Sequence, residues 1–469
     1  MEKYYLAVDI GASSGRHILG HLENGKIELE EIYRFENGMD HKDGKLLWDV
    51  NRLFGEIVAG MKKCKELGKI PVSMAIDTWA VDYVLLDEKD QILGDTYGYR
   101  DHRTDGMDAE VAKILPETEL YARTGIQKQI FNTIYQLMAV EKKTPEILKQ
   151  AKTLLMLPDY FGFRLTGNKL SEYTNGSTTQ LVDPHTYQWD KELIQSLGYP
   201  EEIFLPLKMP GSKVGNLLPQ IREEVGYDLE VVLCGSHDTA SAVMAVPQTE
   251  GDGIYISSGT WSLMGIESLE PIITKEAAAA NLTNEGGYDH RFRFLKNIMG
   301  LWMIQSVRHE YQDAYSFAQL CDMAEESRDF SSRVDVNDQS FLSPDSMIEA
   351  IKQYCQKTGQ PVPETVGELA AVVYRSLAQS YGETVKELET IAGRIYDSIH
   401  IIGGGSNAAY LNQLTADATG KTVYAGPGEA TAIGNLLAQM IHAGDLADLK
   451  GARQYVRDSF EIRAFVPAK

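Results

Sequence analysis

The sequence has no long apolar run: no stretch approaches the ~20 consecutive apolar residues that a membrane-spanning helix needs. Cysteine is also scarce, and the four that occur lie far apart and form no Cys-x-x-Cys pair. This usage argues against a zinc site or a disulfide framework and is typical of a reducing cytosol. The first residues pass directly into a strand-like run without the layout of a signal peptide. We therefore expect a cytoplasmic protein.

Basic residues are in the minority, with 45 Lys and Arg against 67 Asp and Glu, which gives a net charge of −22. A surface this acidic repels nucleic acid backbones and anionic membranes, so neither is expected as a partner. At ~150 residues per domain, 469 residues correspond to roughly three units or two large ones. Nothing in the composition specifies an oligomeric state.

The beginning of the chain predicts a mixed sheet. Apolar, β-rich runs at 4–10, 16–21 and 27–35 are separated by a Gly-Ser turn and an Asn-Gly turn. Helical spacing follows at 48–65, and another buried strand is predicted at 72–76. Three strands, a helix and a strand in this order differ from the βαβ opening of a dinucleotide-binding fold.

The strand–turn–strand pattern of residues 6–20 recurs at 253–265, and residues 247–253 between the two copies have linker composition. A duplicated pair of α/β domains is the simplest explanation. Near the end, an apolar strand at 399–402 leads through three glycines to a helix at 409–419. Glycines at a helix start leave bare backbone against which a flat ring or a phosphate can lie.

The turn after the first strand suits a triphosphate. Its amides and hydroxyls can hold phosphate oxygens, and Asp9 at the strand end can hold Mg²⁺ through water. The alternative is an ordinary hairpin turn with a surface aspartate. Together with Ser258-Gly259-Thr260 and Gly403-Gly404-Gly405, however, the turn predicts two lobes that grip one nucleotide.

Three further polar segments are candidates for sugar chemistry. Asp238 follows an apolar strand and begins a helix, where a carboxylate could receive the proton of a sugar hydroxyl; the alternative is a simple N-cap. His237 beside it is expected to orient or hydrogen-bond rather than act as a base. Residues 77–83 combine carboxylates with aromatic rings, which suits a sugar, or else form a buried turn. Asn297 is expected near the start of a helix at 296–302.

These segments together resemble the FGGY carbohydrate kinases, over residues 5–441. The motifs that carry the resemblance are Asp9-Ile10-Gly11-Ala12-Ser13-Ser14-Gly15-Arg16, Asp77-Thr78-Trp79-Ala80-Val81-Asp82, Ser236-His237-Asp238-Thr239, Ser257-Ser258-Gly259-Thr260-Trp261 and Ile402-Gly403-Gly404-Gly405. The glycine turns alone are unspecific, but their order and spacing with the other motifs are specific.

The resemblance implies two ribonuclease-H-like domains of the actin/Hsp70/sugar kinase superfamily with the active site in the cleft between them. It implies an N-terminal domain at 1–246, a C-terminal nucleotide domain at 247–445 and a packed tail at 446–469. Asp238 would be the general base, and Asp9 the carboxylate associated with Mg²⁺. The sugar-contacting positions would be Ala80, His237, Asp238, Thr239 and Asn297. The ATP-contacting positions would be Ala12, Ser13, Ser14, Gly15, Arg16, Thr260, Gln305 and Gly404.

The expected activity is ATP-dependent phosphorylation of a ketose. The Asp-Thr-Trp-small-Val-Asp pattern at 77–82 is that of the branch acting on the 1-hydroxyl of L-rhamnulose. Where glycerol kinases have an Arg-Glu pair this chain has Ala80-Val81, which argues against a glycerol kinase. L-Fuculose and D-xylulose are alternative substrates, and an Hsp70- or actin-type ATP-driven binding protein is the alternative class. Asp238, beside residues suited to a small polyol, counts against that class.

Overall fold

The computed structural model describes residues 2–248 and 253–468, so the expected linker at 247–253 falls largely outside the described residues. The chain divides into two compact units. Unit 1 consists of residues 1–245, 268–294 and 431–459, and unit 2 of residues 246–267, 295–430 and 460–469. This division differs from the sequential one at 246/247, because two later segments pack into unit 1. The family domains expected at 1–246, 247–445 and 446–469 stay a prediction.

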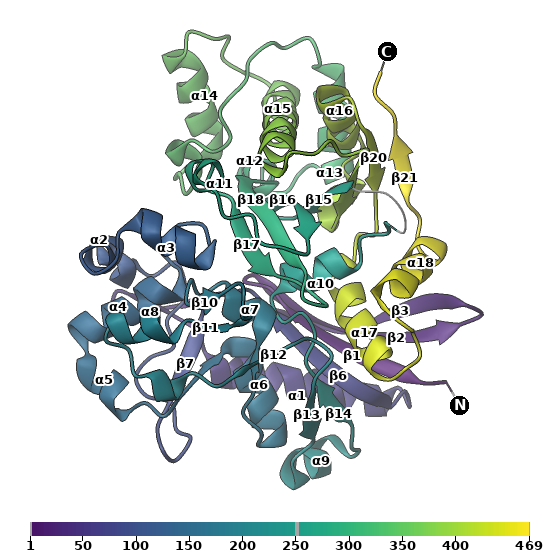
Figure 1. Ribbon diagram of the computed structural model, residues 1–469. Helices are drawn as coiled ribbons and strands as arrows, with labels where there is room; N and C mark the ends of the chain where they lie inside the picture. Colours follow the sequence, from purple (N-terminus) through teal and green to yellow (C-terminus); the bar gives the residue numbers. More distant parts are fainter. Residues whose placement is uncertain (1, 249–252, 469) are drawn as a thin grey trace. The chain divides into compact units, whose positions relative to one another are not determined.

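Unit 1 is built on a six-stranded sheet with the order β13-β14-β6-β1-β2-β3 (Figure 1). β1 is antiparallel to β2 and parallel to β6, and β6 is parallel to β14. The mixed sheet predicted from the first strands is therefore confirmed. The strands are β1 (Tyr4–Ile10), β2 (Ser14–Glu23), β3 (Lys26–Glu36), β6 (Pro71–Thr78), β13 (Lys213–Asn216) and β14 (Glu230–Val232).

Helix α1 (Val50–Glu66) lies between β3 and β6 in the chain, as the sequence predicted. The Asp49 side chain caps it by accepting hydrogen bonds from the amides of Asn51 and Arg52. Its apolar side chains recur at helical spacing and are buried with those of β1 and β6 in one core. A short hairpin of β4 (Asp40–Lys42) and β5 (Lys45–Leu47), which the sequence did not predict, precedes the helix.

The rest of unit 1 surrounds this sheet with short elements. Its further strands are β7 (Tyr83–Leu86), β8 (Thr153–Met156), β9 (Ser171–Glu172), β10 (Val182–Asp183), β11 (Gln188–Trp189), β12 (Leu207–Lys208) and β17 (Thr283–Gly286). Its further helices are α2 (Met107–Ala112), α3 (Glu117–Thr124), α4 (Thr133–Lys143), α5 (Pro145–Gln150), α6 (Leu157–Thr166), α7 (Tyr173–Ser177), α8 (Lys191–Ser196), α9 (Pro219–Val225), α10 (Asp238–Met244), α11 (Lys275–Ala279), α17 (Ala430–His442) and α18 (Leu449–Ser459), with 3₁₀ turns η1 (His102–Thr104) and η2 (Glu201–Ile203).

Helix α17 comes from far along the chain yet packs in unit 1. The Gln439 amide donates to the carbonyl of Leu6 in β1 (2.9 Å) and accepts from the hydroxyl of Ser73 in β6 (2.6 Å). Gly434 lets the helix approach α10 closely, since a Cβ there would lie 1.7 Å from the carbonyl oxygen of Ser241. The helix therefore connects the sheet of unit 1 to the element that carries Asp238.

Unit 2 repeats the strand pattern of unit 1. β15 (Gly253–Ser258) is antiparallel to β16 (Trp261–Ser268) and parallel to β19 (Ser398–Ile402), just as β1 is to β2 and β6, so the predicted recurrence is confirmed at the level of topology. β18 (Phe292–Met299) runs across the division of the chain, between Phe294 and Leu295. The strands of this sheet in unit 2 are, in order, β16 (Trp261–Ser268), β15 (Gly253–Ser258), β19 (Ser398–Ile402), β20 (Thr422–Ala425) and β21 (Arg463–Phe465).

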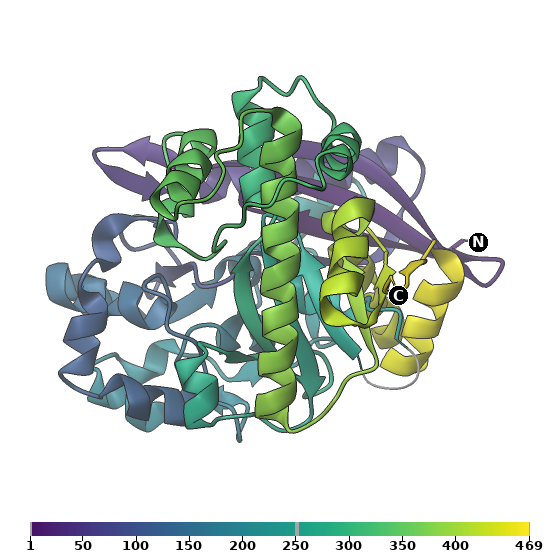
Figure 2. The ribbon, with the colours of Figure 1, turned by 90° about the horizontal axis from the view of Figure 1, so that it is seen from above.

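A long helix, α15 (Val366–Ala392), runs through unit 2 and packs against α13 (Phe317–Glu326) and α16 (Ala409–Thr419) (Figure 2). A capping box of Thr365 and Glu368 begins it, and Gly393 ends it at a φ of 65°. The other helices of unit 2 are α12 (Trp302–Glu310), α13 (Phe317–Glu326), α14 (Met347–Lys357) and α16 (Ala409–Thr419), with 3₁₀ turns η3 (Gln339–Phe341) and η4 (Gly404–Asn407). Among the helices of the described residues, none is both long and apolar enough to span a bilayer.

Candidate active site

Three strand ends of unit 1 meet at one edge of its sheet. Asp9 at the end of β1 lies opposite Asp77 in the parallel register with β6. Beyond β14, His237 forms a bridge with Thr78, whose amide donates to the carbonyl of Ser236 (2.9 Å). Because the carboxyl ends of neighbouring parallel strands meet at the same edge, segments distant in sequence converge here.

The carboxylates at this edge have different partners. Asp9 forms an ion pair with Arg16 (Oδ2–Nη2, 2.8 Å). Asp77 is fully buried, and its Oδ2 accepts a hydrogen bond from Asn435 of α17 (2.6 Å). Its Oδ1 has no hydrogen-bond partner among the described residues. Burial and then the charge of Asp9 raise the pKa of Asp77 well above its usual range. Asp9 is itself 9% exposed, so it is not the surface aspartate of the alternative reading.

The turn between β1 and β2 carries the predicted phosphate-contacting residues Ala12 to Arg16. It is shorter than predicted, because β2 begins at Ser14. The amide of Gly11 donates to the carbonyl of Ser14 (2.8 Å), and Asn37 holds the turn from outside by donating to the carbonyl of Gly11 (2.8 Å). Gly15 is required here, since a Cβ would lie 2.1 Å from the ring of Phe35.

Asp238 occupies the first position of α10, and His237 is the N-cap residue, so Asp238 is not the cap of the alternative reading. Its Oδ1 accepts hydrogen bonds from the amide (2.6 Å) and the hydroxyl (3.1 Å) of Thr239. Among the described residues no hydrogen bond to Oδ2 is found. Burial raises the pKa of Asp238 and Asp9 adds to this, whereas His237 opposes it. The carboxylate therefore has one oxygen occupied and one available.

Close to this loop lies a buried carboxylate that was not predicted as a site residue from the sequence. Glu172 accepts hydrogen bonds from the amides of Thr174 (2.7 Å) and Asn175 (3.0 Å), and so caps α7. It also accepts from the hydroxyl of Ser236 (2.6 Å), which fixes the segment that leads to His237. The sequence could have indicated the cap, because an acidic residue directly before a helix is a capping signal. It could not indicate the contact with Ser236, which lies 64 positions away.

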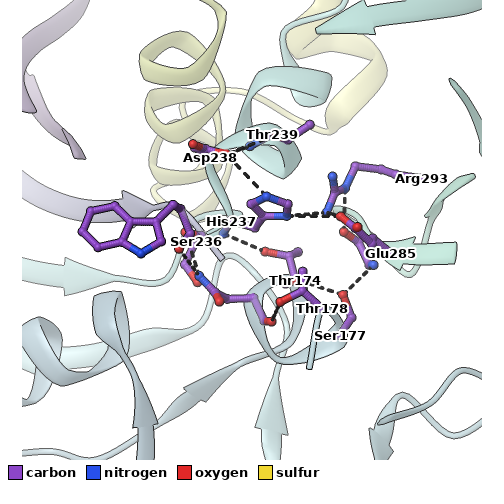
Figure 3. A network of polar contacts seen from close by, with 12 residues as sticks. Thr174, Ser177, Thr178, Ser236, His237, Asp238, Thr239, Glu285 and Arg293 are labelled. Atoms are coloured by element: carbon purple, nitrogen blue, oxygen red, sulfur yellow. Dashed lines mark hydrogen bonds and ion pairs between the residues drawn. The ribbon is translucent and has the colours of Figure 1, made fainter. Parts of the chain in front are cut away.

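His237 is held from its other side by two residues that no motif contains. Its Nδ1 lies 3.0 Å from Nη2 of Arg293 and 3.3 Å from Oε2 of Glu285 (Figure 3). Its Nε2 lies 3.5 Å from Oδ1 of Asp238. Glu285 lies in β17 and Arg293 in β18, so this network connects the end of one sheet edge to a neighbouring hairpin.

Ala80 lies in a turn built around a buried carboxylate. Asp82 accepts hydrogen bonds from the indoles of Trp48 (2.6 Å) and Trp79 (2.9 Å). Val81 has a φ of 67°, which is rare for a β-branched residue, and its carbonyl accepts from the hydroxyl of Thr133 (2.7 Å). The turn is therefore held in a strained conformation by buried contacts on both sides of Ala80.

Unit 2 brings together three of the predicted nucleotide residues. Thr260 lies in the turn between β15 and β16, and its hydroxyl is 3.5 Å from Oε1 of Gln305 in α12. Gly405 packs against the same strand end, since a Cβ there would lie 1.9 Å from the hydroxyl of Ser258. At Gly404, by contrast, a Cβ would meet nothing within 4 Å. This glycine therefore presents open backbone beside the turn.

The predicted helix at 296–302 is wrong. Asn297 lies in β18, and α12 begins only at Trp302, after Gly300. The backbone of Gly300 passes so close to the hairpin that a Cβ would lie 2.5 Å from the carbonyl carbon of Trp261, and this contact ends the strand before the helix. The Oδ1 of Asn297 is buried without a hydrogen-bond partner among the described residues.

Comparison with known families agrees with this arrangement. Residues 4–245 match the N-terminal domain, and residues 254–443 the C-terminal domain, of the FGGY family of carbohydrate kinases. The chain belongs to this family. It is a sugar kinase, and kinases of this family use ATP as co-substrate. The fold expected from the sequence motifs is thereby confirmed.

Two similar curated proteins are called rhamnulokinase. The one from Halalkalibacterium halodurans is 54% identical over 99% of both chains, and the one from Bacillus subtilis is 48% identical over 99% of this chain and 95% of its own. Among solved structures, a xylulose kinase from Lactobacillus acidophilus has a TM-score of 0.80 at 16% identity, covering 99% of this chain and 94% of its own. A glycerol kinase from Plasmodium falciparum with ADP has a TM-score of 0.78 at 14% identity, with the same coverage. These structures support the fold alone.

Proposed function

We propose that this protein transfers the γ-phosphoryl group of ATP to the 1-hydroxyl of L-rhamnulose, giving L-rhamnulose 1-phosphate and ADP, in the breakdown of L-rhamnose. The similarity to proteins called rhamnulokinase over nearly the whole of both chains supports this substrate. The observation that carries the chemistry is Asp238, whose Oδ1 is occupied by Thr239 while its Oδ2 is free of hydrogen bonds within the described chain.

In this proposal Asp238 is the general base. The sugar oxygen forms a bond to the γ-phosphorus, the bond from that phosphorus to the leaving oxygen of ADP breaks, and the hydroxyl proton passes to Oδ2 of Asp238. His237, Thr239, Ala80 and Asn297 contact the sugar. The buried, unpartnered Oδ1 of Asn297 is an acceptor suited to a hydroxyl.

The nucleotide is assigned to the two glycine-bearing hairpins. The turn of Ala12, Ser13, Ser14, Gly15 and Arg16 contacts the phosphates, with Arg16 as its only permanent cation. In unit 2, Thr260, Gln305 and Gly404 contact the rest of the nucleotide, since Gly404 exposes backbone that no neighbouring atom covers.

A magnesium ion fits the acidic sheet edge of unit 1. Asp9 lies beside Asp77, whose Oδ1 is buried and unpartnered within the described chain, and carboxylate oxygens are the ligands that Mg²⁺ prefers. The described residues contain no group of three or more metal-binding side chains, so Asp9 would hold the ion through water. When bound, the ion would neutralise charge on the phosphate oxygens.

We also propose a cytoplasmic location without nucleic acid or membrane partners, on the strength of the −22 charge and the four buried free thiols.

The test is ADP release measured with L-rhamnulose, L-fuculose, D-xylulose and no sugar. We expect turnover with L-rhamnulose to exceed the others, and Asp238→Asn to lower kcat by about 10²- to 10⁴-fold with ATP binding retained. Asp183→Asn, which changes a carboxylate at the end of β10, is the matched control. Preference for another ketose would reassign the substrate. Strong ATP hydrolysis without sugar would favour a binding protein of the Hsp70 or actin type.

A further inference from the structure

Arg293 is a charged residue with no solvent exposure at all. Its Nε donates to the carbonyl of Gly286 (2.8 Å), and its Nη2 lies 3.1 Å from Oε2 of Glu285. A buried guanidinium is costly unless it is paired, and Glu285 supplies the opposite charge. Burial by itself would raise the pKa of Glu285, but that pKa is lowered overall, and the charge of Arg293 is the largest of the opposing effects. Pairing explains how the charge survives burial, but not why it is directed at His237.

The contact with His237 determines where the imidazole carries its proton. Nη2 of Arg293 lies 3.0 Å from Nδ1, and a guanidinium can only donate. Nδ1 must therefore accept, which leaves the ring proton on Nε2. Glu285 lies 3.3 Å from the same Nδ1 and by itself would favour a proton there. Arg293 is closer to the ring nitrogen and is always protonated, so its donor decides the tautomer.

A proton on Nε2 faces Asp238, because Nε2 lies 3.5 Å from its Oδ1. That oxygen already accepts from the amide and the hydroxyl of Thr239. The Nε2 hydrogen therefore lies on the Oδ1 side of the carboxylate, where Thr239 already donates two hydrogen bonds, and Oδ2 is left to receive a proton. The orientation of the carboxylate depends on a hydrogen whose position is set by Arg293, on the far side of the imidazole.

We propose that Arg293, with Glu285 as its counter-charge, is a positioning residue that holds His237 in the Nε2–H tautomer and thereby orients Asp238 for proton abstraction. Arg293 and Glu285 do not touch the reacting atoms in this scheme. The tautomer is a property of the protein alone, whereas its effect on turnover rests on the proposed function.

The first experiment measures the tautomer without any substrate. Nitrogen-15 NMR of protein labelled at histidine distinguishes a pyrrole-like from a pyridine-like ring nitrogen, and His237→Asn identifies the signal of His237. We expect a pyridine-like Nδ1 and a pyrrole-like Nε2 in the unchanged protein and in Glu285→Gln. Arg293→Met should move the proton toward Nδ1, next to Glu285. A proton on Nδ1 alone in the unchanged protein, or a flip in Glu285→Gln but not in Arg293→Met, overturns the proposal whatever the substrate is.

The second experiment measures turnover. Arg293→Met should lower kcat by about tenfold or more, but by no more than the ~10²- to 10⁴-fold that a positioned general base contributes, with the KM for ATP unchanged. Arg293→Lys keeps a donor and should recover part of the loss. Arg123→Met, which removes a bidentate pair with Asp190 elsewhere in unit 1, is the control for losing a partly buried ion pair. An unchanged kcat in Arg293→Met contradicts the positioning role. If Arg293→Met does not fold, the His237 tautomer measured by NMR in the unchanged protein and in Arg293→Lys tests the proposal instead.

Discussion

The protonation of one buried residue, Asp82, makes the stability of this protein depend on pH. It is 1% exposed and accepts four hydrogen bonds, three of them on Oδ2 from Trp48, Trp79 and Tyr99, and one on Oδ1 from Gln136. Burial raises the pKa of Asp82 to about 6, although these hydrogen bonds oppose the shift. The carboxyl therefore keeps its proton to a higher pH in the folded protein than in the unfolded chain.

Because the pKa of Asp82 is higher in the folded state than in the unfolded chain, the stability of the protein should depend on pH. Between about pH 4 and about pH 6 the folded state binds more protons at Asp82, so the free energy of unfolding falls as the pH rises through that window. Relative to Asp82→Asn, the unchanged protein should gain up to about 3 kcal/mol on acidification from pH 7 to pH 4. Urea unfolding of both proteins across this range measures the difference, and a difference independent of pH would contradict the shift.

Two neighbouring glycines in unit 2 have different roles: we expect Gly404 to contact the nucleotide and Gly405 to allow close packing. A Cβ on Gly404 meets nothing within 4 Å, whereas a Cβ on Gly405 would lie 1.9 Å from the hydroxyl of Ser258. We expect Gly404→Ala to keep the Tm and to raise the KM for ATP about tenfold, which corresponds to about 1.4 kcal/mol of lost contact. Gly405→Ala should instead lower the Tm. A Gly404→Ala variant with unchanged KM would remove Gly404 from the nucleotide site.

The residues that the sequence could identify are those in contiguous motifs. Asp9, Asp238 and Gly404 stand at the ends of apolar strands, where a local pattern of a strand followed by glycine or a small polar residue marks them. Arg293 could not be found in this way, because it lies 56 positions from His237 and is buried within a strand with no motif around it. Asn435 of α17, which donates to Asp77, is 358 positions away from its partner. Contacts of this kind depend on the fold, not on spacing.

At the scale of elements, the strand at Tyr4–Ile10 and the helix at Ala409–Thr419 have the bounds that the sequence predicted. Both are uniform in pattern and stop at glycine or small residues. The helix expected at 296–302 was wrong because its few apolar side chains fit either period, and the neighbouring hairpin makes the segment a strand up to Met299. Tertiary contacts determine whether a short segment with ambiguous periodicity forms a helix or a strand.

The contact of α17 with α10 predicts the effect of one methyl group. A Cβ on Gly434 would lie 1.7 Å from the backbone oxygen of Ser241, so one helix must move. We expect Gly434→Ala to cost about 1–3 kcal/mol of stability and to lower kcat, because α10 carries Asp238. Gly55→Ala in α1 meets nothing within 4 Å and should instead stabilise by about 0.5–1 kcal/mol. Urea unfolding and turnover measure both, and equal effects of the two changes would contradict close packing at Gly434.

At the scale of the whole molecule, unit 1 is assembled from three separate stretches of the chain. The last stretch supplies α17 and α18, whose buried side chains include Leu436, Leu437 and Val456. Gln439 adds polar contacts to two strands of the sheet. The sequential boundary expected at 246/247 therefore divides the chain at a place where the core of unit 1 is incomplete.

This incompleteness predicts the behaviour of fragments. A fragment of residues 1–246 exposes the apolar surface that α17 and α18 cover, so we expect it to aggregate or to unfold without a cooperative transition. Joining residues 268–294 and 430–459 to the same fragment through flexible linkers should restore solubility and a sharp thermal transition, because all three stretches of unit 1 are then present. Circular dichroism melting of both fragments is the measurement. Equally cooperative melting of the shorter fragment would show that its core closes without the C-terminal helices, and that the sequential division is the physical one.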